Sequence, residues 1–253
     1  MSDAGHAVTA WGGMSALSRR DAQVVELVGR FRLMGAEQIR AVLFTTQSSK
    51  TPLDRALKRL TDTGYLARIG RMVGGFGGGS GQYVYQLGHL GWRQLGKGGG
   101  YRPVRVIDHH ALTIAECFVL LKRLERGGEL AVLSYAADPA SRRTVGEILL
   151  TPDAYVELGV QATRQKFTFW LEIDRDTENA EIIRGKCVRY WRAFQAWPGD
   201  VFPYVVFVVP DEGRRREVER VIAGGPDEAQ SLFRVGELDG FPELIRRVST
   251  QNK

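Results

Sequence analysis

Two stretches of sequence decide the fold of this chain: Thr151-Pro152-Asp153-Ala154-Tyr155-Val156-Glu157 and, after a turn, Phe167-Thr168-Phe169-Trp170-Leu171-Glu172-Ile173-Asp174. In the first stretch apolar and polar residues alternate after the proline, which is the pattern of a strand with one buried face. Asp153 and Glu172 would then lie on neighbouring strands, where two carboxylates can share one divalent cation. We therefore predict a sheet that carries a pair of acidic side chains at one place.

The segments around these strands predict a mixed α/β unit. The periodicity indicates, in chain order, a helix over 108–126, a strand over 129–135, the two stretches above, a helix over 179–196, a strand over 202–209, a helix over 213–223 and a strand over 231–235. The order α-β-β-β-α-β-α-β is typical of an α/β sandwich built on a mixed sheet.

The N-terminal part has a different pattern. Helical spacing predicts helices over 19–32, 36–44 and 50–64, and alternation then predicts strands over 65–73 and 82–87, joined by a glycine-rich tip and followed by a short helix over 90–95. Three short helices followed by a hairpin are the winged helix-turn-helix arrangement. We expect a disordered segment over 1–16, a winged-helix domain over 17–96, a linker over 97–107 and a mixed-sheet α/β domain over 108–253.

The charge of the chain is concentrated in its N-terminal part. Residues 1–106 hold 15 Lys and Arg against 6 Asp and Glu, whereas residues 107–253 hold 20 against 23. The net charge of +9 on the first part suits a polyanion, and nucleic acid is the first candidate. A generally basic, soluble surface is the alternative that charge by itself leaves open.

The third predicted helix and the first hairpin strand carry the candidate DNA contacts. In a winged helix the third helix enters the major groove and the hairpin lies near the backbone or the minor groove. The basic and hydroxyl side chains in these positions are Ser49, Lys50, Thr51, Arg55, Lys58, Arg59, Arg68 and Arg71. Lysine and arginine here can neutralise phosphates, and Arg55 is placed to reach a base edge. The alternative is that these charged side chains only keep an outward face of the helix soluble.

The acidic strands have the residues of a phosphodiesterase site with one exception. Metal-dependent cleavage needs carboxylates that hold Mg²⁺ or Mn²⁺, and a nearby lysine usually supports the attacking water or the transition state. Asp153 and Glu172 are the candidate metal pair, with Glu116 as a third acid. A Pro-Asp strand followed by an apolar strand that ends in acid-x-lysine resembles the motif of one large nuclease superfamily, but here Asp174 occupies the lysine position. Lys186 on the following helix is the candidate replacement, and Tyr190 one turn later would face the same side. Alternatively, these acidic residues form only a solvent-exposed rim at the strand ends and bind no metal.

The strand that contains Thr151-Pro152-Asp153-Ala154-Tyr155, the strand that ends in Glu172-Ile173-Asp174 and the helix with Lys186 and Tyr190 resemble the replication-relaxation family of actinobacteria, their plasmids and phages. The resemblance covers nearly the whole chain. It implies an N-terminal winged helix, a C-terminal domain similar to the PD-(D/E)XK nuclease fold, and a link to plasmid replication or mobilisation.

These observations predict a DNA-binding protein of a mobile element that acts in replication or transcriptional control. We expect a homodimer on double-stranded DNA, with a nuclease-like domain that serves assembly or further DNA contact. The alternatives are a Mg²⁺- or Mn²⁺-dependent endonuclease or nickase that uses Asp153, Glu172 and Lys186, and a protein-interaction module; whether the chain is an enzyme stays open. Two cysteines and four histidines are too few for a zinc cluster. Without a secretion signal or a membrane-spanning apolar run, we expect a cytoplasmic protein with no membrane partner.

Overall fold

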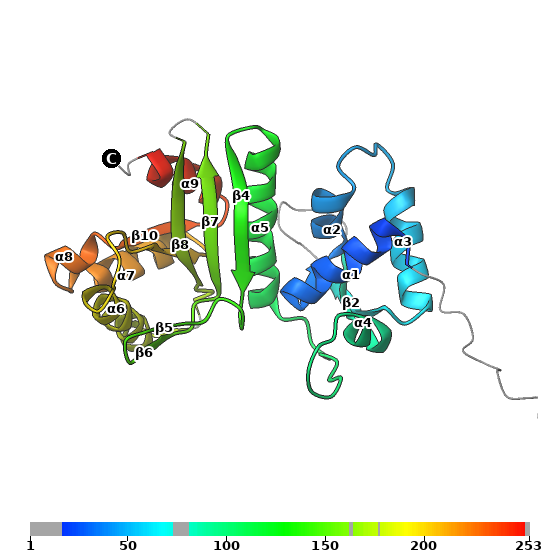
Figure 1. The fold of residues 1–253 in the computed structure, drawn as a ribbon, viewed down its shortest axis with the longest axis horizontal. Helices are drawn as coiled ribbons and strands as arrows, with labels where there is room; N and C mark the ends of the chain where they lie inside the picture. The colour runs from blue at the N-terminus through cyan, green and yellow to red at the C-terminus, as the bar shows by residue number, and fades with distance from the viewer. Residues whose placement is uncertain (1–16, 73–80, 162–163, 177, 251–253) are drawn as a thin grey trace, which may run out of the picture.

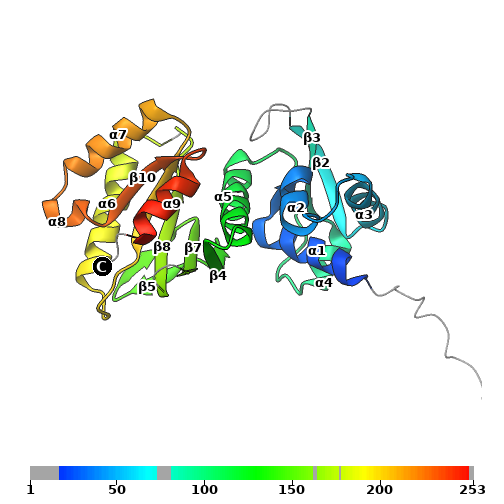
Figure 2. The ribbon, with the colours of Figure 1, turned by 90° about the horizontal axis from the view of Figure 1, so that it is seen from above.

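The computed structural model describes residues 17–72, 81–161, 164–176 and 178–250. It forms two lobes that lie on either side of one long helix (Figures 1 and 2). The predicted disordered segment 1–16 and most of the predicted glycine-rich tip lie outside the described residues.

The N-terminal lobe contains the predicted helices and hairpin. Its elements are α1 (Arg19–Phe31), β1 (Leu33–Gly35), α2 (Ala36–Leu43), α3 (Thr51–Asp62), β2 (Leu66–Met72), β3 (Gln82–Leu87) and α4 (His89–Gln94). Strand β1 pairs with β3, so that the small sheet has the order β1-β3-β2 with both pairs antiparallel. The sequence did not predict β1, because its three residues are all buried and show no alternation.

The C-terminal lobe is built on a five-stranded mixed sheet, which confirms the predicted fold class. Its elements are α5 (His109–Arg126), β4 (Leu130–Ala137), β5 (Arg143–Val145), β6 (Ile148–Leu150), β7 (Ala154–Val160), β8 (Gln165–Ile173), α6 (Ala180–Gln195), β9 (Tyr204–Val209), α7 (Glu212–Ala223), α8 (Asp227–Gln230), β10 (Phe233–Glu237) and α9 (Phe241–Thr250). The strand order is β10-β9-β8-β7-β4. Strands β4, β7 and β8 run antiparallel, and β8, β9 and β10 run parallel.

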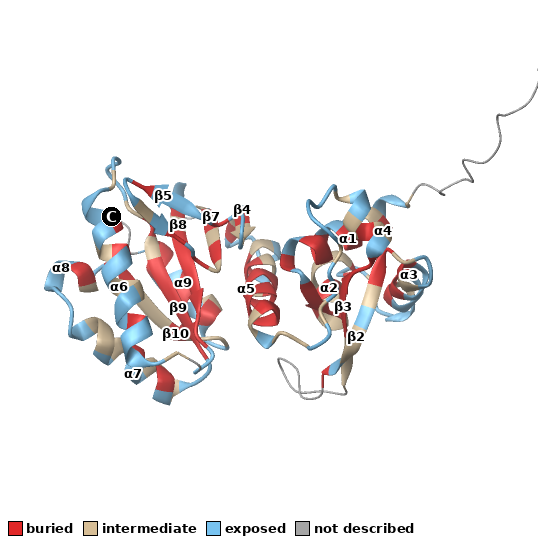
Figure 3. Cartoon of the chain, turned by 90° about the horizontal axis from the view of Figure 1, so that it is seen from below, coloured by how far each residue is buried: buried red, intermediate tan, exposed pale blue. Residues whose placement is uncertain are grey.

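Two layers of helices cover this sheet. One face packs on α5 and α9, and strand β8 contributes Phe169 and Leu171 to that core. The other face packs on α6 and α7 and on the small β5–β6 hairpin, and the same strand contributes Trp170 there. The buried residues in the centre of the sheet and along α5 are visible in Figure 3. Because successive strand residues point to opposite faces, one strand supplies both cores.

Helix α5 joins the two lobes through aromatic contacts. The ring of Phe118 on α5 lies 5.1 Å from that of Phe31 at the end of α1 and 5.2 Å from that of Tyr135 on β4. The Tyr135 hydroxyl also donates to the Ile114 carbonyl of α5 at 2.7 Å. Residues of both lobes therefore belong to one hydrophobic core.

Buried polar contacts fix α2 against α5. Gln38 donates from Nε2 to the Leu112 carbonyl and to Glu116 Oε2, both at 2.9 Å, and its Oε1 accepts from the Gly35 backbone N–H at 3.0 Å. At the other end of the contact, Arg126 donates to the Ala41 carbonyl at 2.9 Å. Two of these hydrogen bonds thus join α2 to α5, and the third caps the start of α2.

The segment between the lobes packs on the small sheet. Val104 exchanges two hydrogen bonds with the Gln86 side chain of β3, at 2.7 and 2.9 Å, and the Tyr101 hydroxyl donates to the Leu87 carbonyl at 3.1 Å. The predicted linker therefore contacts the hairpin. In the described part of the chain, no helix has the length and apolar character needed to cross a bilayer.

We predict that Gln38→Ala lowers the free energy of unfolding by about 1–3 kcal/mol, because the buried Glu116 carboxylate loses its hydrogen-bond donor. Urea unfolding followed by tryptophan fluorescence measures the change. Gln165→Ala, at an exposed position of β8, is the matched control and should stay within about 0.5 kcal/mol of the wild type. Equal stability of the Gln38→Ala variant and the wild type would contradict this role for Gln38.

Candidate functional site

The two predicted acidic residues lie side by side at one end of the sheet. Ala154 pairs with Leu171 across β7 and β8, so that Asp153, just before β7, lies beside Glu172. The Asp153 backbone N–H donates to the Leu171 carbonyl at 3.0 Å, and its Oδ2 accepts from the Ile173 N–H at 2.7 Å. Backbone hydrogen bonds therefore fix the position of the Asp153 side chain.

Glu172 is buried and each of its carboxylate oxygens has a partner on α6. Oε1 accepts from the Tyr190 hydroxyl at 2.5 Å, and Oε2 lies 2.9 Å from Lys186 Nζ. Lys186 also pairs with Glu178 Oε1 at 2.8 Å. These two α6 residues lie on the side that the sequence indicates, one turn apart.

Burial controls the ionisation of this cluster. It raises the pKa of Glu172 from 4.5 to about 7; Lys186 opposes the shift and the neighbouring Asp153 adds to it. Burial alone would lower the pKa of Lys186, but Glu172 and Glu178 hold it above its ordinary value. The pKa of the Tyr190 hydroxyl is raised by burial and by Glu172. Tyr190 therefore stays protonated and donates its hydrogen bond to the carboxylate.

Asp174, which stands where the nuclease motif has lysine, is paired with an arginine from another helix. Its Oδ2 lies 2.7 Å from Arg214 Nε of α7, and both side chains are buried. Arg214 also contacts Glu217 at 2.8 Å and donates to the Glu178 carbonyl. The extra negative charge that Asp174 brings to this position is therefore neutralised by a cation that sequence spacing could not identify.

His110 makes a contact with Asp153 that the sequence did not predict. From the first turn of α5 its Nε2 lies 2.8 Å from Asp153 Oδ1, and this hydrogen bond raises the pKa of the imidazole. The two residues line a cleft of about 330 Å³ that Arg30 and Arg142 also border. The adjacent histidines of the sequence were the only available signal, and their position against β7 is a tertiary property.

The two acids of the predicted metal pair already have donors from the protein. Both oxygens of Asp153 and both oxygens of Glu172 have donors from the protein at 2.5–2.9 Å. Glu116, the predicted third acid, instead accepts from Gln38 between α5 and α2. Within the ranges that the structure describes, no three His, Cys, Asp or Glu side chains form a group that could hold a metal ion.

Several of the predicted DNA contacts are already paired within the N-terminal lobe. Lys50 Nζ lies 2.6 Å from Glu37 Oε1, and Lys58 Nζ lies 2.6 Å from Asp62 Oδ2. The Ser49 hydroxyl donates to that of Thr51 at 2.9 Å at the start of α3.

Arg59 has a structural partner that the sequence reasoning missed. It binds the buried Asp21 of α1 with two nitrogens, at 2.7 and 3.0 Å, and this hydrogen bonding raises the pKa of the guanidinium. A bidentate pair with a buried carboxylate holds α3 against α1. Arg55, by contrast, is exposed and has no ion pair or hydrogen bond with any residue that the structure describes.

The hairpin arginines share one aromatic ring. The guanidinium carbon of Arg68 lies 3.9 Å from the centre of the Tyr83 ring, and that of Arg71 lies 4.9 Å from it. Both arginines are exposed. Cation–π contacts of this kind orient a guanidinium group while its N–H donors stay available.

Three comparisons relate the chain to known proteins. A model of the family described as replication-relaxation matches residues 25–205. No curated protein matches the chain. Among solved structures, the restriction endonuclease FokI bound to DNA is similar with 10% sequence identity and a TM-score of 0.29, over 91% of this chain and 45% of that one. The chain thus spans less than half the length of that protein.

We predict that Glu172→Gln flattens the pH dependence of stability between about pH 4.5 and pH 7. The folded-state pKa of Glu172 is raised to about 7, so the folded protein keeps a proton that the unfolded chain has lost in this window. The contribution of Glu172 to stability is complete below pH 4.5 and falls as the pH rises, by at most about 1.4 kcal/mol per pH unit.

Urea unfolding at a series of pH values measures this slope. Glu181→Gln, on the exposed side of the same helix, is the control and should keep the wild-type slope. Identical slopes for Glu172→Gln and the wild type would contradict the burial argument. Lys186 keeps Glu178 as a partner in the variant, so it does not become an unpaired buried charge.

Proposed function

Because the chain belongs to the replication-relaxation family, we propose that it is a DNA-binding protein of a mobile element that acts in replication or transcriptional control. In this proposal the lobe built from α1–α4 and β1–β3 is a winged-helix domain. Helix α3 contacts base edges in the major groove, and the hairpin contacts the DNA backbone.

The observation that carries the proposal is the position of Arg55. An exposed arginine in the middle of α3 that makes no ion pair within the described chain contributes nothing visible to folding, and it can form two hydrogen bonds with a guanine. Lys50 and Lys58 support it, because their surface ion pairs are worth only about 0–1 kcal/mol and can be exchanged for phosphates.

The hairpin arginines support the same surface. Arg71 and Tyr83 border one cleft together with Lys50 and Asp54 of the α3 region. DNA that lies along α3 would therefore also meet the hairpin. A homodimer with two-fold symmetry would place two α3 helices on two half-sites, and light scattering on the protein in solution tests that part of the proposal.

The C-terminal lobe takes part as a scaffold. The carboxylates of Glu172, Asp174 and Asp153 are paired with Lys186, Arg214 and His110 respectively. This arrangement favours assembly or additional DNA contact over catalysis.

We predict that Arg55→Ala weakens binding to DNA from the protein's own operon or plasmid origin by about 1–3 kcal/mol and reduces the discrimination against unrelated DNA. Arg220, an exposed arginine near the end of α7 with no ion pair within the described residues, provides the control. Fluorescence anisotropy at several salt concentrations measures both variants. If the wild type binds DNA with neither sequence preference nor salt dependence, the proposal is wrong.

A metal-dependent endonuclease is the second candidate, and the 2.9 Å distance between Lys186 Nζ and Glu172 favours it. A lysine on α6 then replaces the one missing from β8. We predict instead that wild type and Asp153→Ala leave supercoiled plasmid equally intact in Mg²⁺ or Mn²⁺, because the carboxylates are occupied by protein donors. Nicking by the wild type that Asp153→Ala abolishes would establish the enzyme. Agarose electrophoresis of the plasmid separates the two results.

A further inference from the structure

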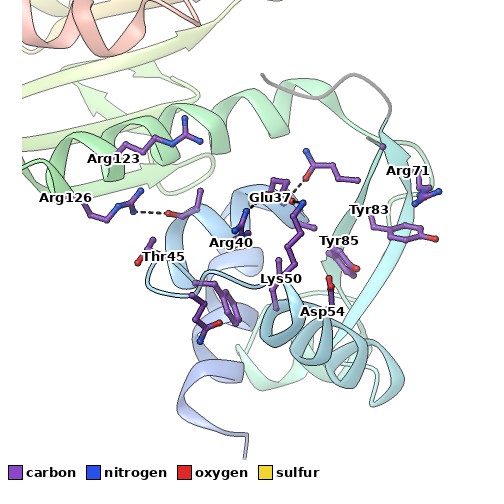
Figure 4. A pocket seen from close by; sticks show the side chains of 17 residues that line it. Glu37, Arg40, Thr45, Lys50, Asp54, Arg71, Tyr83, Tyr85, Arg123 and Arg126 are labelled. Carbon is purple, nitrogen blue, oxygen red and sulfur yellow. Dashed lines mark hydrogen bonds and ion pairs between the residues drawn. The ribbon is translucent and has the colours of Figure 1, made fainter. Parts of the chain in front are cut away.

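One large cleft in the described structure is lined by residues of both lobes. The cleft, of about 810 Å³, lies between α2, the start of α3, strands β2 and β3, and the last turns of α5. In Figure 4, Arg123 and Arg126 of α5 lie on one side of the cleft, Arg71 and Tyr83 on the other, and Lys50 lies between them. Neither α5 arginine belongs to the contact set that the sequence predicted.

The lining of the cleft is strongly basic. Its cations are Arg40, Lys50, Arg71, Arg123 and Arg126, and its carboxylates are those of Glu37 and Asp54. Glu37 is already shared by Lys50 at 2.6 Å and Arg40 at 3.4 Å, and these contacts lower its pKa. The guanidinium groups of Arg123 and Arg126 line the cleft without an ion pair among the described residues, although the charge of Arg123 lowers the pKa of Glu116 on the same helix.

Arg123 is not required for the packing of α5. It is exposed and makes no hydrogen bond or ion pair across the residues that the structure describes. Its neighbour Arg126 contacts the Ala41 carbonyl, and burial, with Arg123 adding to it, lowers the pKa of that guanidinium. Two like charges held near each other destabilise the free protein, and an anion between them and Lys50 relieves this repulsion.

The helix dipole explains only part of this arrangement. Cations in the last turn of a helix interact favourably with its C-terminal carbonyl groups, and both arginines lie in the last turn of α5. The dipole does not require that they share one cleft with Lys50 and Arg71 from other elements. A phosphodiester backbone satisfies all of these cations at once.

We infer that the end of α5 is a second DNA-binding element, at which Arg123 and Arg126 bind a backbone phosphate of the same DNA that α3 contacts. The inference rests on the proposed DNA-binding function and extends it to a helix of the C-terminal lobe. Since α5 packs on both lobes, this contact fixes the orientation of the sheet relative to the DNA.

The test compares Arg123→Ala with Arg220→Ala, which removes another exposed helical arginine, from α7. The probe is a fluorescein-labelled duplex of mixed sequence, titrated with each protein at several salt concentrations. Arg123→Ala should weaken binding about tenfold, because one charge-assisted hydrogen bond is lost. It should also reduce the magnitude of the negative slope of log K against log salt by about 0.9. Arg220→Ala should match the wild type. Arg123→Lys keeps the charge and should restore most of the salt slope.

The outcomes separate the two proposals. If the wild type binds, Arg55→Ala weakens binding and Arg123→Ala equals Arg220→Ala, the contact by α5 is wrong and the winged-helix function stands. If the wild type shows no salt-dependent binding to any duplex, both proposals fail. Thermal unfolding of Arg123→Ala should stay close to that of the wild type, because the side chain loses no hydrogen bond or ion pair within the described chain and acts on Glu116 only through its charge.

Discussion

The contact of Phe118 with Phe31 and Tyr135 is the interaction on which the rest of the structure depends. Three rings from α1, α5 and β4 lie within 5.1–5.6 Å of one another, and they join the core of the N-terminal lobe to that of the sheet. Helix α5 is therefore buried both toward the sheet and toward α1 and α2. Gln38 and Arg126 add hydrogen bonds along the same helix. The two lobes consequently share one hydrophobic core, which runs through α5.

The same helix connects the two functional regions. Its first turn presents His110 to Asp153 at the end of the sheet, and its last turn presents Arg123 and Arg126 to the basic cleft. At the sheet, each acidic side chain has a protein partner, so burial and ion pairing replace the exposed acidic pair that a metal needs. At the cleft, the cations outnumber the carboxylates. The electrostatics therefore favour an anionic ligand at the N-terminal lobe and a closed, neutralised cluster at the C-terminal lobe.

Local patterns predicted most of the elements. Helical spacing located α1, α2, α3, α5 and α6, and alternation located the hairpin and the central strands, because one buried face is enough to produce a period. These sequence patterns did not predict elements that are short or that are buried on every side. Strand β1 has three buried residues, and the β5–β6 hairpin has three residues in each strand. Helix α9 was missed although Phe241, Leu244, Ile245 and Val248 have helical spacing.

The candidate site was predictable only in part, for a related reason. Asp153, Glu172, Lys186 and Tyr190 come together as strand register and helix periodicity indicate. The partners that decide their chemistry come from distant segments: Arg214 lies 40 residues after Asp174, and His110 lies 43 residues before Asp153. The pairing of Arg59 with Asp21, 38 residues away, changes a predicted DNA contact into a structural one in the same way. No local pattern contains such long-range pairs.

The central claim is that α3 and α5 form one DNA-binding surface. Arginine modification by phenylglyoxal, with and without duplex DNA and with each site quantified by mass spectrometry, tests it most directly. The account predicts that DNA protects Arg55 and Arg123 together and leaves Arg220 as reactive as in the free protein. Equal modification of Arg123 with and without DNA, while Arg55 is protected, would contradict it.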